Sequence, residues 1–404
     1  MGSWVERRPG VLGNSEFRAL WIAEAQSVAG DQLAKVAITL VVYARTHSAL
    51  WAALAYALTF LPALIGGLGF AQLADRYPRR AVLVVSTSVQ AVFIGGMAVP
   101  GMPLTAMCAL LFAAGIAQAP ALAAQNAITR EILAVDTVYY RSQDLRAVTT
   151  NTVMLVGLAA AGVLVTLLGT STTLAIDALT FALSSLLVGF GVRCRRAAAG
   201  ATAARSAGLR YVLHTPWLRT LLGLSWLVGL AVVPEGLAAP LAAELGASPR
   251  AVGWLLAADP LGYVVGVFLL SRLVSIATRQ RLVGLFAVAS PAVLLLFVFT
   301  PELWSALAVL ALAGACGAYQ VTVGATLTSW VPNEVRGGVL GIGRTGLRVS
   351  QGLGVAAGGA IGQLLGSASY AIVAAAALGV LLALPLVAGW VRHSRSTLVA
   401  AARA

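Results

Sequence analysis

The sequence is poor in charge. Only 10% of its 404 residues are Asp, Glu, Lys or Arg, 59% are hydrophobic, and the mean hydropathy is +0.90. These values exclude an ordinary soluble domain. Lys35 is the only lysine, so the net charge of +13 comes from arginine. Most arginines stand in short turns between apolar runs, where they orient a membrane protein rather than bind nucleic acid. We therefore expect a lipid bilayer around the chain and no nucleic-acid partner.

Cysteine is scarce too, and the three thiols at Cys108, Cys194 and Cys316 show neither an evident disulfide pair nor a metal-ligand spacing. We expect no metal, no other cofactor and no catalytic residues. The longest segment between apolar runs is far below the size of a folded domain, which argues against an enzyme or a receptor with a separate output module. The first 17 residues are polar and the next run is longer than a signal-peptide core, so we expect no cleaved signal.

Long apolar runs are abundant instead. Twelve are long enough to cross a hydrocarbon core of ~30 Å as helices. They cover residues 18–44, 49–73, 81–99, 104–127, 146–168, 172–192, 218–243, 251–271, 281–299, 303–329, 338–366 and 368–391. With both termini in the cytoplasm, most of the 27 Lys and Arg residues lie on the cytoplasmic side, and Arg45 and Arg250 lie outside. This asymmetry predicts an all-α integral membrane protein with N-in, C-in topology.

A basic stretch rich in small residues divides the chain. We predict an N-terminal six-helix half over residues 1–192 and a cytoplasmic linker with an amphipathic segment over 193–217. A C-terminal six-helix half with a short cytoplasmic tail follows over 218–404. One common offset superimposes Gly69 on Gly266, and Gly157 on Gly354, a weak sign that the halves are related.

Ionisable residues inside a span are costly, so each is a functional candidate. The first span holds Glu24, Asp31 and Lys35. At ~100° per residue, all three fall within a sector of ~40° on one helix face. Asp31 lies ~20 Å along the helix from Arg18, not far from the middle of the bilayer. We predict Asp31 as first choice for a proton-coupling carboxyl, and Glu24 as another candidate. The alternative is that Asp31 and Lys35 merely neutralise each other.

The second half carries two further acids beside prolines. Glu235 stands between Pro234 and Gly236, and Asp259 precedes Pro260. Proline interrupts a spanning helix, and interrupted spans often line cavities. We predict both acids as proton-coupling candidates, with hydrogen bonding in an outer gate as the alternative. For Asp177 a packing or interfacial role is favoured.

Other polar and aromatic side chains inside the spans are candidates for the wall of a substrate cavity. These are Lys35, Gln26, Trp226, Tyr263 and Tyr319. For Arg348 the interpretations are snorkelling to the cytoplasmic interface or facing the cavity.

A charged octapeptide, Leu73-Ala-Asp-Arg-Tyr-Pro-Arg-Arg80, joins the runs 49–72 and 81–99, which hold no charged residue. It resembles the loop between helices 2 and 3 of the major facilitator superfamily, whose pattern is roughly G-x-L-a-D-R-x-G-R-R. Ala71 and Pro78 replace the two glycines of that pattern. The resemblance implies two six-helix halves with substrate held between them near the midplane.

The resemblance also implies a conformational latch at the cytoplasmic side. Asp75 would lie against the helix that begins near Gly337 and Gly338, where its carboxylate is favoured by ~0.3–2 kcal/mol. Arg76 or Arg80 would pair with Glu131 or Asp136.

The start of the chain, Phe17-Arg-Ala-Leu-Trp and then Gly30-Asp31, looks most like the macrolide- and siderophore-exporting branch. This implies proton-coupled efflux of a hydrophobic small molecule from a bacterial cytoplasmic membrane, by a monomer. The run from Gly157 to Gly162 lacks the proline of the drug-antiporter pattern. Three alternatives remain: a proton-coupled importer, a lysophospholipid flippase and a non-transporting membrane sensor.

Overall fold

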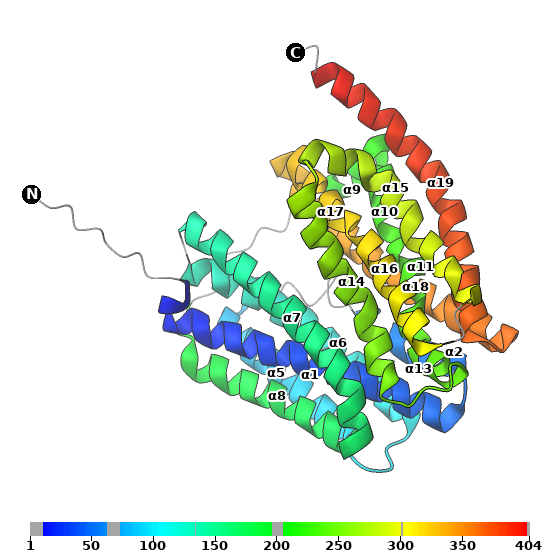
Figure 1. Ribbon diagram of the computed structural model, residues 1–404. Coiled ribbons are helices and arrows are strands. Elements are labelled where there is room, and N and C mark those ends of the chain that lie inside the picture. The colour runs from blue at the N-terminus through cyan, green and yellow to red at the C-terminus, as the bar shows by residue number, and fades with distance from the viewer. Residues whose placement is uncertain (1–10, 63–72, 134, 196–204, 300–301, 402–404) are drawn as a thin grey trace, which may run out of the picture. The chain divides into compact units, whose positions relative to one another are not determined.

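The computed structural model describes residues 11–62, 73–133, 135–195, 205–299 and 302–401. Within these ranges every regular element is a helix (Figure 1). The chain divides into two compact units. Unit 1 comprises Met1–Ala34, Ile65–Gly157 and Ser171–Gly200, and unit 2 comprises Lys35–Leu64, Leu158–Thr170 and Ala201–Ala404.

Unit 1 contains the beginning of α1 and most of α7, together with the helices between and after them. The bounds are η1 (Val11–Gly13), α1 (Ser15–Thr46), α4 (Leu73–Arg76), α5 (Arg79–Met97), α6 (Leu104–Ile132), α7 (Asp136–Leu168) and α8 (Thr170–Gly191). In this unit α5 lies against α6 along much of its length. A core of Leu20, Val82, Ile128 and Val188 joins α1, α5, α6 and α8.

Unit 2 holds the remaining helices. They are α2 (Ala49–Ala57), α9 (Arg205–His214), α10 (Pro216–Trp226), α11 (Val228–Ala231), α12 (Val233–Gly236), α13 (Ala238–Glu244), α14 (Ala251–Leu273), α15 (Ile276–Leu294), η3 (Leu295–Phe299), α16 (Leu303–Gly317), α17 (Tyr319–Trp330), α18 (Asn333–Leu365) and α19 (Ala368–Ala401). In this unit α14 lies against α16, α15 against α19, and α18 against α2 (Figure 1).

These units do not follow the halves expected from the sequence. Unit 2 includes the end of α1, all of α2 and the end of α7. Helix α2 packs on α12, α13 and α18, and α9 packs on α18. The contacts therefore group segments from both sides of the 193–217 linker, and the division into sequence halves stays a prediction about topology.

Ten of the twelve expected spans coincide with helices that are long and apolar enough to cross a membrane. The expected span 49–73 begins as α2 and continues into residues outside the described part of the chain. The expected span 338–366 falls in α18, a helix of 33 residues. Its many glycines and its arginines make it less apolar than the other ten. The multi-pass membrane fold is confirmed, and the count of twelve and the N-in, C-in topology stay predictions.

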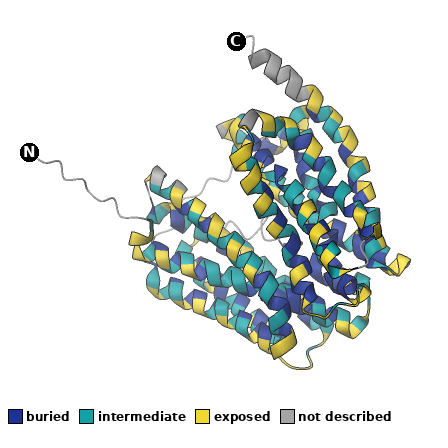
Figure 2. Ribbon diagram, in the orientation of Figure 1, coloured by how far each residue is buried: buried dark blue, intermediate teal, exposed yellow. Residues whose placement is uncertain are grey.

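Burial follows helix faces. Figure 2 shows dark-blue residues gathered where helices of one unit meet and yellow ones on outward faces. Many outward residues are large and apolar, with Phe190 89% exposed and Leu364 85% exposed. An apolar outer surface on helices whose backbone groups bond internally suits a bilayer.

Candidate functional site

Glu235 is placed by a broken stretch of helix in unit 2. The span predicted over 218–243 consists of four short helices, and Glu235 lies in α12 directly after Pro234. Tyr56 of α2 donates a hydrogen bond from its hydroxyl to Glu235 Oε2 at 2.5 Å. Tyr56 is only 4% exposed, so the bond lies inside the unit. The acid is thus held by a neutral phenol from a helix far away in the sequence.

Charged groups act on Glu235 as well. Lys35 of α1 and Arg348 of α18 act electrostatically on Glu235, and Glu235 acts on Asp259 of α14. The Arg348 guanidinium lies over the Phe60 ring, 5.7 Å from its centroid. Arg348 is exposed, and both interpretations, snorkelling to the interface and facing the cavity, stay predictions.

Asp259 is fixed by close packing of α14 on α16. Its backbone lies directly against Gly314 of α16. Its charge acts on Tyr263, one turn further along α14. Asp259, Glu235, Lys35 and Tyr263, all predicted from the sequence, therefore belong to one electrostatic neighbourhood in unit 2.

Glu24 has a different partner in unit 1. Arg146 of α7 binds its carboxylate with both ends of the guanidinium fork, Nε at 2.6 Å and Nη2 at 2.8 Å. Asn126 and Gln143 accept hydrogen bonds from Arg146 Nη1. The Arg146 side chain is 6% exposed and that of Glu24 14% exposed. Bidentate pairs of this kind fix the position of the carboxylate. The geometry favours a structural role for Glu24.

The other polar residues of α1 contact α6 and α8. Gln118 of α6 donates to Asp31 Oδ2 at 3.1 Å. Gln26, predicted as a cavity residue, donates to Ser184 Oγ at 2.9 Å and to the Thr180 carbonyl at 3.3 Å. Gln26 therefore joins α1 to α8. Asp177 of α8 is fully buried, so of the packing and interfacial roles favoured from the sequence only an interior position fits.

Two aromatic candidates join helices in unit 2. Tyr319 is a core residue, 3% exposed, and its hydroxyl donates to the Leu224 carbonyl at 2.8 Å. Trp226 is partly buried against the same core, and its ring nitrogen donates to the Gly343 carbonyl at 3.1 Å. Backbone carbonyls therefore satisfy the polar groups of both rings. Their place on the wall of a substrate cavity stays a prediction.

The loop pairing also differs from the expectation. Glu131 of α6 pairs with Arg79, whereas Arg80 donates to the Gly189 carbonyl of α8. Neighbouring residues leave a helix ~100° apart, so only one of these two arginines can face α6. The side chains of Asp75 and Asp136 lie outside the described part of the chain. Gly338 packs against Gly208 of α9, and Gly337 is exposed. The roles of Arg76 and of the Asp75 contact stay predictions.

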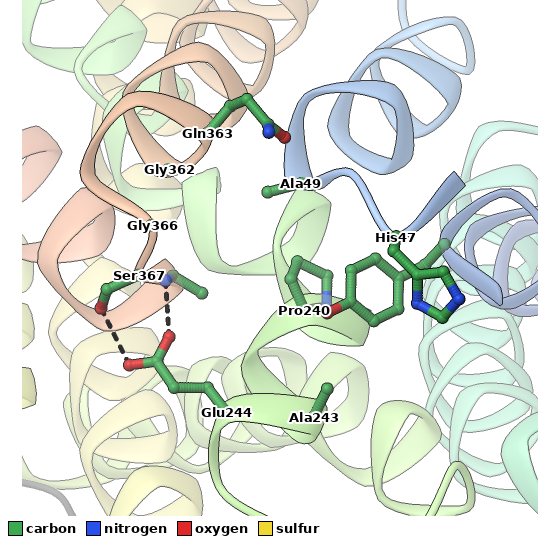
Figure 3. Close-up of a pocket in the computed structure, with 11 residues that line it drawn as sticks. His47, Ala49, Pro240, Ala243, Glu244, Gly362, Gln363, Gly366 and Ser367 are labelled. Carbon is green, nitrogen blue, oxygen red and sulfur yellow. Dashed lines mark hydrogen bonds between the residues drawn. The ribbon is translucent and has the colours of Figure 1, made fainter. Parts of the chain in front are cut away.

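A cavity of about 360 Å³ opens in unit 2, where α1, α13 and α18 end (Figure 3). Tyr43, His47 and Gln363 line it, and Glu244 caps α19 at its edge. Glu244 accepts from Ser367 Oγ at 2.9 Å and from Ala368 N at 2.5 Å. The cavity holds none of the predicted proton-coupling acids, so it is not the midplane substrate site expected from the sequence.

The bonds from Tyr56 to Glu235 and from Arg146 to Glu24 were not expected from the sequence. Arg146 was expected at the edge of a span, but α7 begins at Asp136, which places Arg146 ~3 turns inside the helix. Glu24 inside the first span is the feature of the sequence that points to such a partner. A buried carboxylate needs a cation at the same depth in the membrane. Nothing in the local sequence marks Tyr56 as a donor.

The chain is also similar to known proteins in its sequence. Residues 10–398 match the model of the transmembrane secretion effector family of major facilitators. The chain belongs to that family. No curated protein sequence matches the chain.

Solved structures confirm the fold. A bacterial homologue of the human lysosomal transporter Spinster, in an inward-facing and unoccupied conformation, matches with a TM-score of 0.73 at 14% identity, over 95% of this chain and 97% of that one. A point mutant of the nucleoside transporter NupG matches with a TM-score of 0.70 at 15% identity, over 93% and 99%. A bacterial homologue of the iron transporter ferroportin, inward-facing, gives 0.69 at 14% identity, over 92% and 98%. The family and the fold are those of transporters, and the expectation of a major facilitator is confirmed.

Proposed function

We propose that this transporter exports a hydrophobic small molecule, such as an antibiotic, siderophore or secondary metabolite, in exchange for protons. The observation that carries the proposal is the 2.5 Å bond from the Tyr56 hydroxyl to Glu235. The phenol stays neutral while the carboxyl bonded to it gains or loses a proton. Burial disfavours the charged form of an acid, so closing the site favours proton uptake and opening it favours release.

The bond also links the proton to movement. Tyr56 lies in α2 and Glu235 in α12, and each has its own contacts with α18. A change of charge on Glu235 changes its bond to Tyr56 and its attraction to Lys35 and Arg348. Protonation would thereby bias how α2 packs on its neighbours, as alternating access requires.

The direction of transport rests on the family. Its members are described as secretion effectors, which supports export over import. Protons that enter down their gradient would then drive the substrate outward. The bacterial cytoplasmic membrane and the monomeric state belong to the same proposal.

The test uses inverted membrane vesicles with a pH-sensitive dye and a panel of lipophilic antibiotics, dyes and siderophores. We expect substrate-evoked proton movement in the wild type and its loss in Glu235→Gln. Glu302→Gln, which removes an exposed acid of unit 2, is the matched control and should behave like the wild type. Asp31→Asn is measured beside them, because Asp31 is the first choice from the sequence.

Three outcomes of this experiment distinguish between the candidate proton sites or reject proton exchange. Loss in Glu235→Gln alone assigns the coupling proton to Glu235, and loss in Asp31→Asn alone assigns it to Asp31. If no compound evokes proton movement in the wild type, exchange of this substrate class for protons is rejected.

A further inference from the structure

Asp177 is a buried carboxyl that has no part in the Glu235 mechanism. It lies in α8, ~10 Å from the beginning of that helix, and its exposure is 0%. Thr180 donates to the Asp177 carbonyl at 2.7 Å and reaches Asp177 Oδ1 at only 3.4 Å. Asp177 Oδ2 has no hydrogen-bond partner among the described residues. A buried carboxylate with such weak support is poorly stabilised in its charged form.

The charged group that acts on Asp177 from α1 is another acid. Gly30 lies directly against the Asp177 carboxyl, and Asp31 follows it in the chain. The charge of Asp31 acts on Asp177. Lys35, one turn further along α1, belongs to unit 2, where it acts on Glu235.

Helix α5 packs on an adjacent face of α8, through Gly95 and Ala178. The ionisable residues of α5 are Arg79 and Arg80, at its beginning, ~18 Å or more from Asp177 along α8. Within the described residues of α5, no cation therefore lies at the depth of Asp177.

The sequence leaves room for this carboxyl at Gly30. A Cβ atom at that position would overlap both Asp177 Oδ1 and Thr180 Oγ1. Glycine lets α1 approach α8 with the Asp177 carboxyl between them. The same close approach lets the charge of Asp31, the residue after Gly30, act on Asp177. Two carboxyls that share a site do not both ionise readily, so they bind protons as a pair.

We propose that Asp177 and Asp31 form a two-carboxyl proton-binding site in unit 1, with Asp177 as the buried member. Asp31 is half-buried and bonded to Gln118, so it is the member that exchanges protons with water. In the transfer step, the Asp177 O–H bond breaks, an O–H bond forms on the Asp31 carboxylate, and Asp177 is left ionised. The inference rests on the proposed proton coupling and deepens it, because it adds a proton store in unit 1 to the acids of unit 2.

The test is infrared spectroscopy of the full-length protein reconstituted in liposomes, recorded over a pH series. Protonated carboxyls give a carbonyl stretching band that carboxylates lack. We expect a band in the wild type at neutral pH that Asp177→Asn removes and that Asp144→Asn, which replaces an exposed aspartate of α7, leaves intact. In Asp31→Asn the band should remain, but its intensity should change over a different pH range.

Two results would overturn the inference. An Asp177→Asn spectrum identical to that of the wild type means that Asp177 carries no proton. A band with the same pH dependence in Asp31→Asn means that the two acids do not act as a pair. If Asp177→Asn does not fold, Asp177→Glu is measured in its place. A carbonyl band at the wild-type position in Asp177→Glu would again show that the band does not come from Asp177. The measurement needs no substrate, so its failure is distinct from failure of the proposed export.

Discussion

Two acids in the membrane-spanning helices, one in each unit, have opposite kinds of partner. Glu24 in unit 1 is held by both ends of the Arg146 guanidinium, with Asn126 and Gln143 on the same arginine. Glu235 in unit 2 accepts a hydrogen bond from the hydroxyl of Tyr56, and Lys35 and Arg348 act on it electrostatically. Position within a span is therefore common to both acids, whereas the partner of each acid differs.

The largest effect on stability is expected from breaking the ion pair between Arg146 and Glu24 in unit 1. Arg146→Gln leaves Glu24 buried and uncompensated, which costs about 3–5 kcal/mol in the free energy of unfolding. The measurement is denaturant unfolding of the purified protein in detergent micelles. Combining Arg146→Gln with Glu24→Gln should recover much of the loss, because no lone charge then remains. A double variant as unstable as Arg146→Gln would show that Glu24 is not the group that needs the arginine.

The second largest effect is expected for the hydrogen bond to Glu235 in unit 2. Tyr56→Phe keeps the ring and removes the donor, so Glu235 loses a hydrogen bond to a charged group worth about 1.5–3 kcal/mol. We expect the pH profile of substrate-evoked proton movement to shift while transport persists.

The control is Tyr370→Phe, which removes the hydroxyl of an exposed tyrosine of α19. An unchanged pH profile in Tyr56→Phe would mean that the bond does not govern the protonation of Glu235.

The closeness of helix packing at two glycines also differs between the units. In unit 2, a Cβ atom on Gly354 of α18 would overlap the backbone of Gly229 in α11, whereas in unit 1 a Cβ on Gly95 would lie 3.6 Å from Ala178. Gly354→Ala should therefore cost about 1–3 kcal/mol of stability through overpacking. Gly95→Ala should be nearly neutral, because that separation is an ordinary contact. Thermal unfolding followed by tryptophan fluorescence compares the two, and equal losses would refute the steric explanation.

The smallest effect is expected for the ion pair at the beginning of α5. Arg79 and Glu131 have side chains 16% and 25% exposed, so their pairing should contribute about 0.5–1 kcal/mol. A double-mutant cycle with Arg79→Gln and Glu131→Gln should show this coupling energy. The same cycle with Arg80→Gln should be additive, and coupling there instead would restore the pairing expected from the sequence.

Much of the fold could be predicted from the sequence, because the signals for it are local. The apolar runs and the arginines between them identify a multi-pass membrane protein, and Leu73–Arg80 points to the superfamily. The polar residues of α1 were also recognisable, since helical periodicity alone places Glu24, Asp31 and Lys35 on one face.

The partners of those residues could not be predicted. Arg146 lies 122 positions from Glu24, and Glu235 lies 179 positions from Tyr56. The carbonyls that accept hydrogen bonds from Trp226 and Tyr319 also lie on other helices, so the sequence could not identify them.

The sequence by itself therefore determined that the chain spans a membrane, which superfamily it resembles and which acids lie within its spans. Only the tertiary structure decided that Glu24 is neutralised by an arginine, that Glu235 is bonded to a phenol and that Asp177 is buried against Gly30. Hydropathy and helical periodicity are properties of neighbouring residues. The charge state that a buried acid can adopt depends on side chains that packing brings from distant helices.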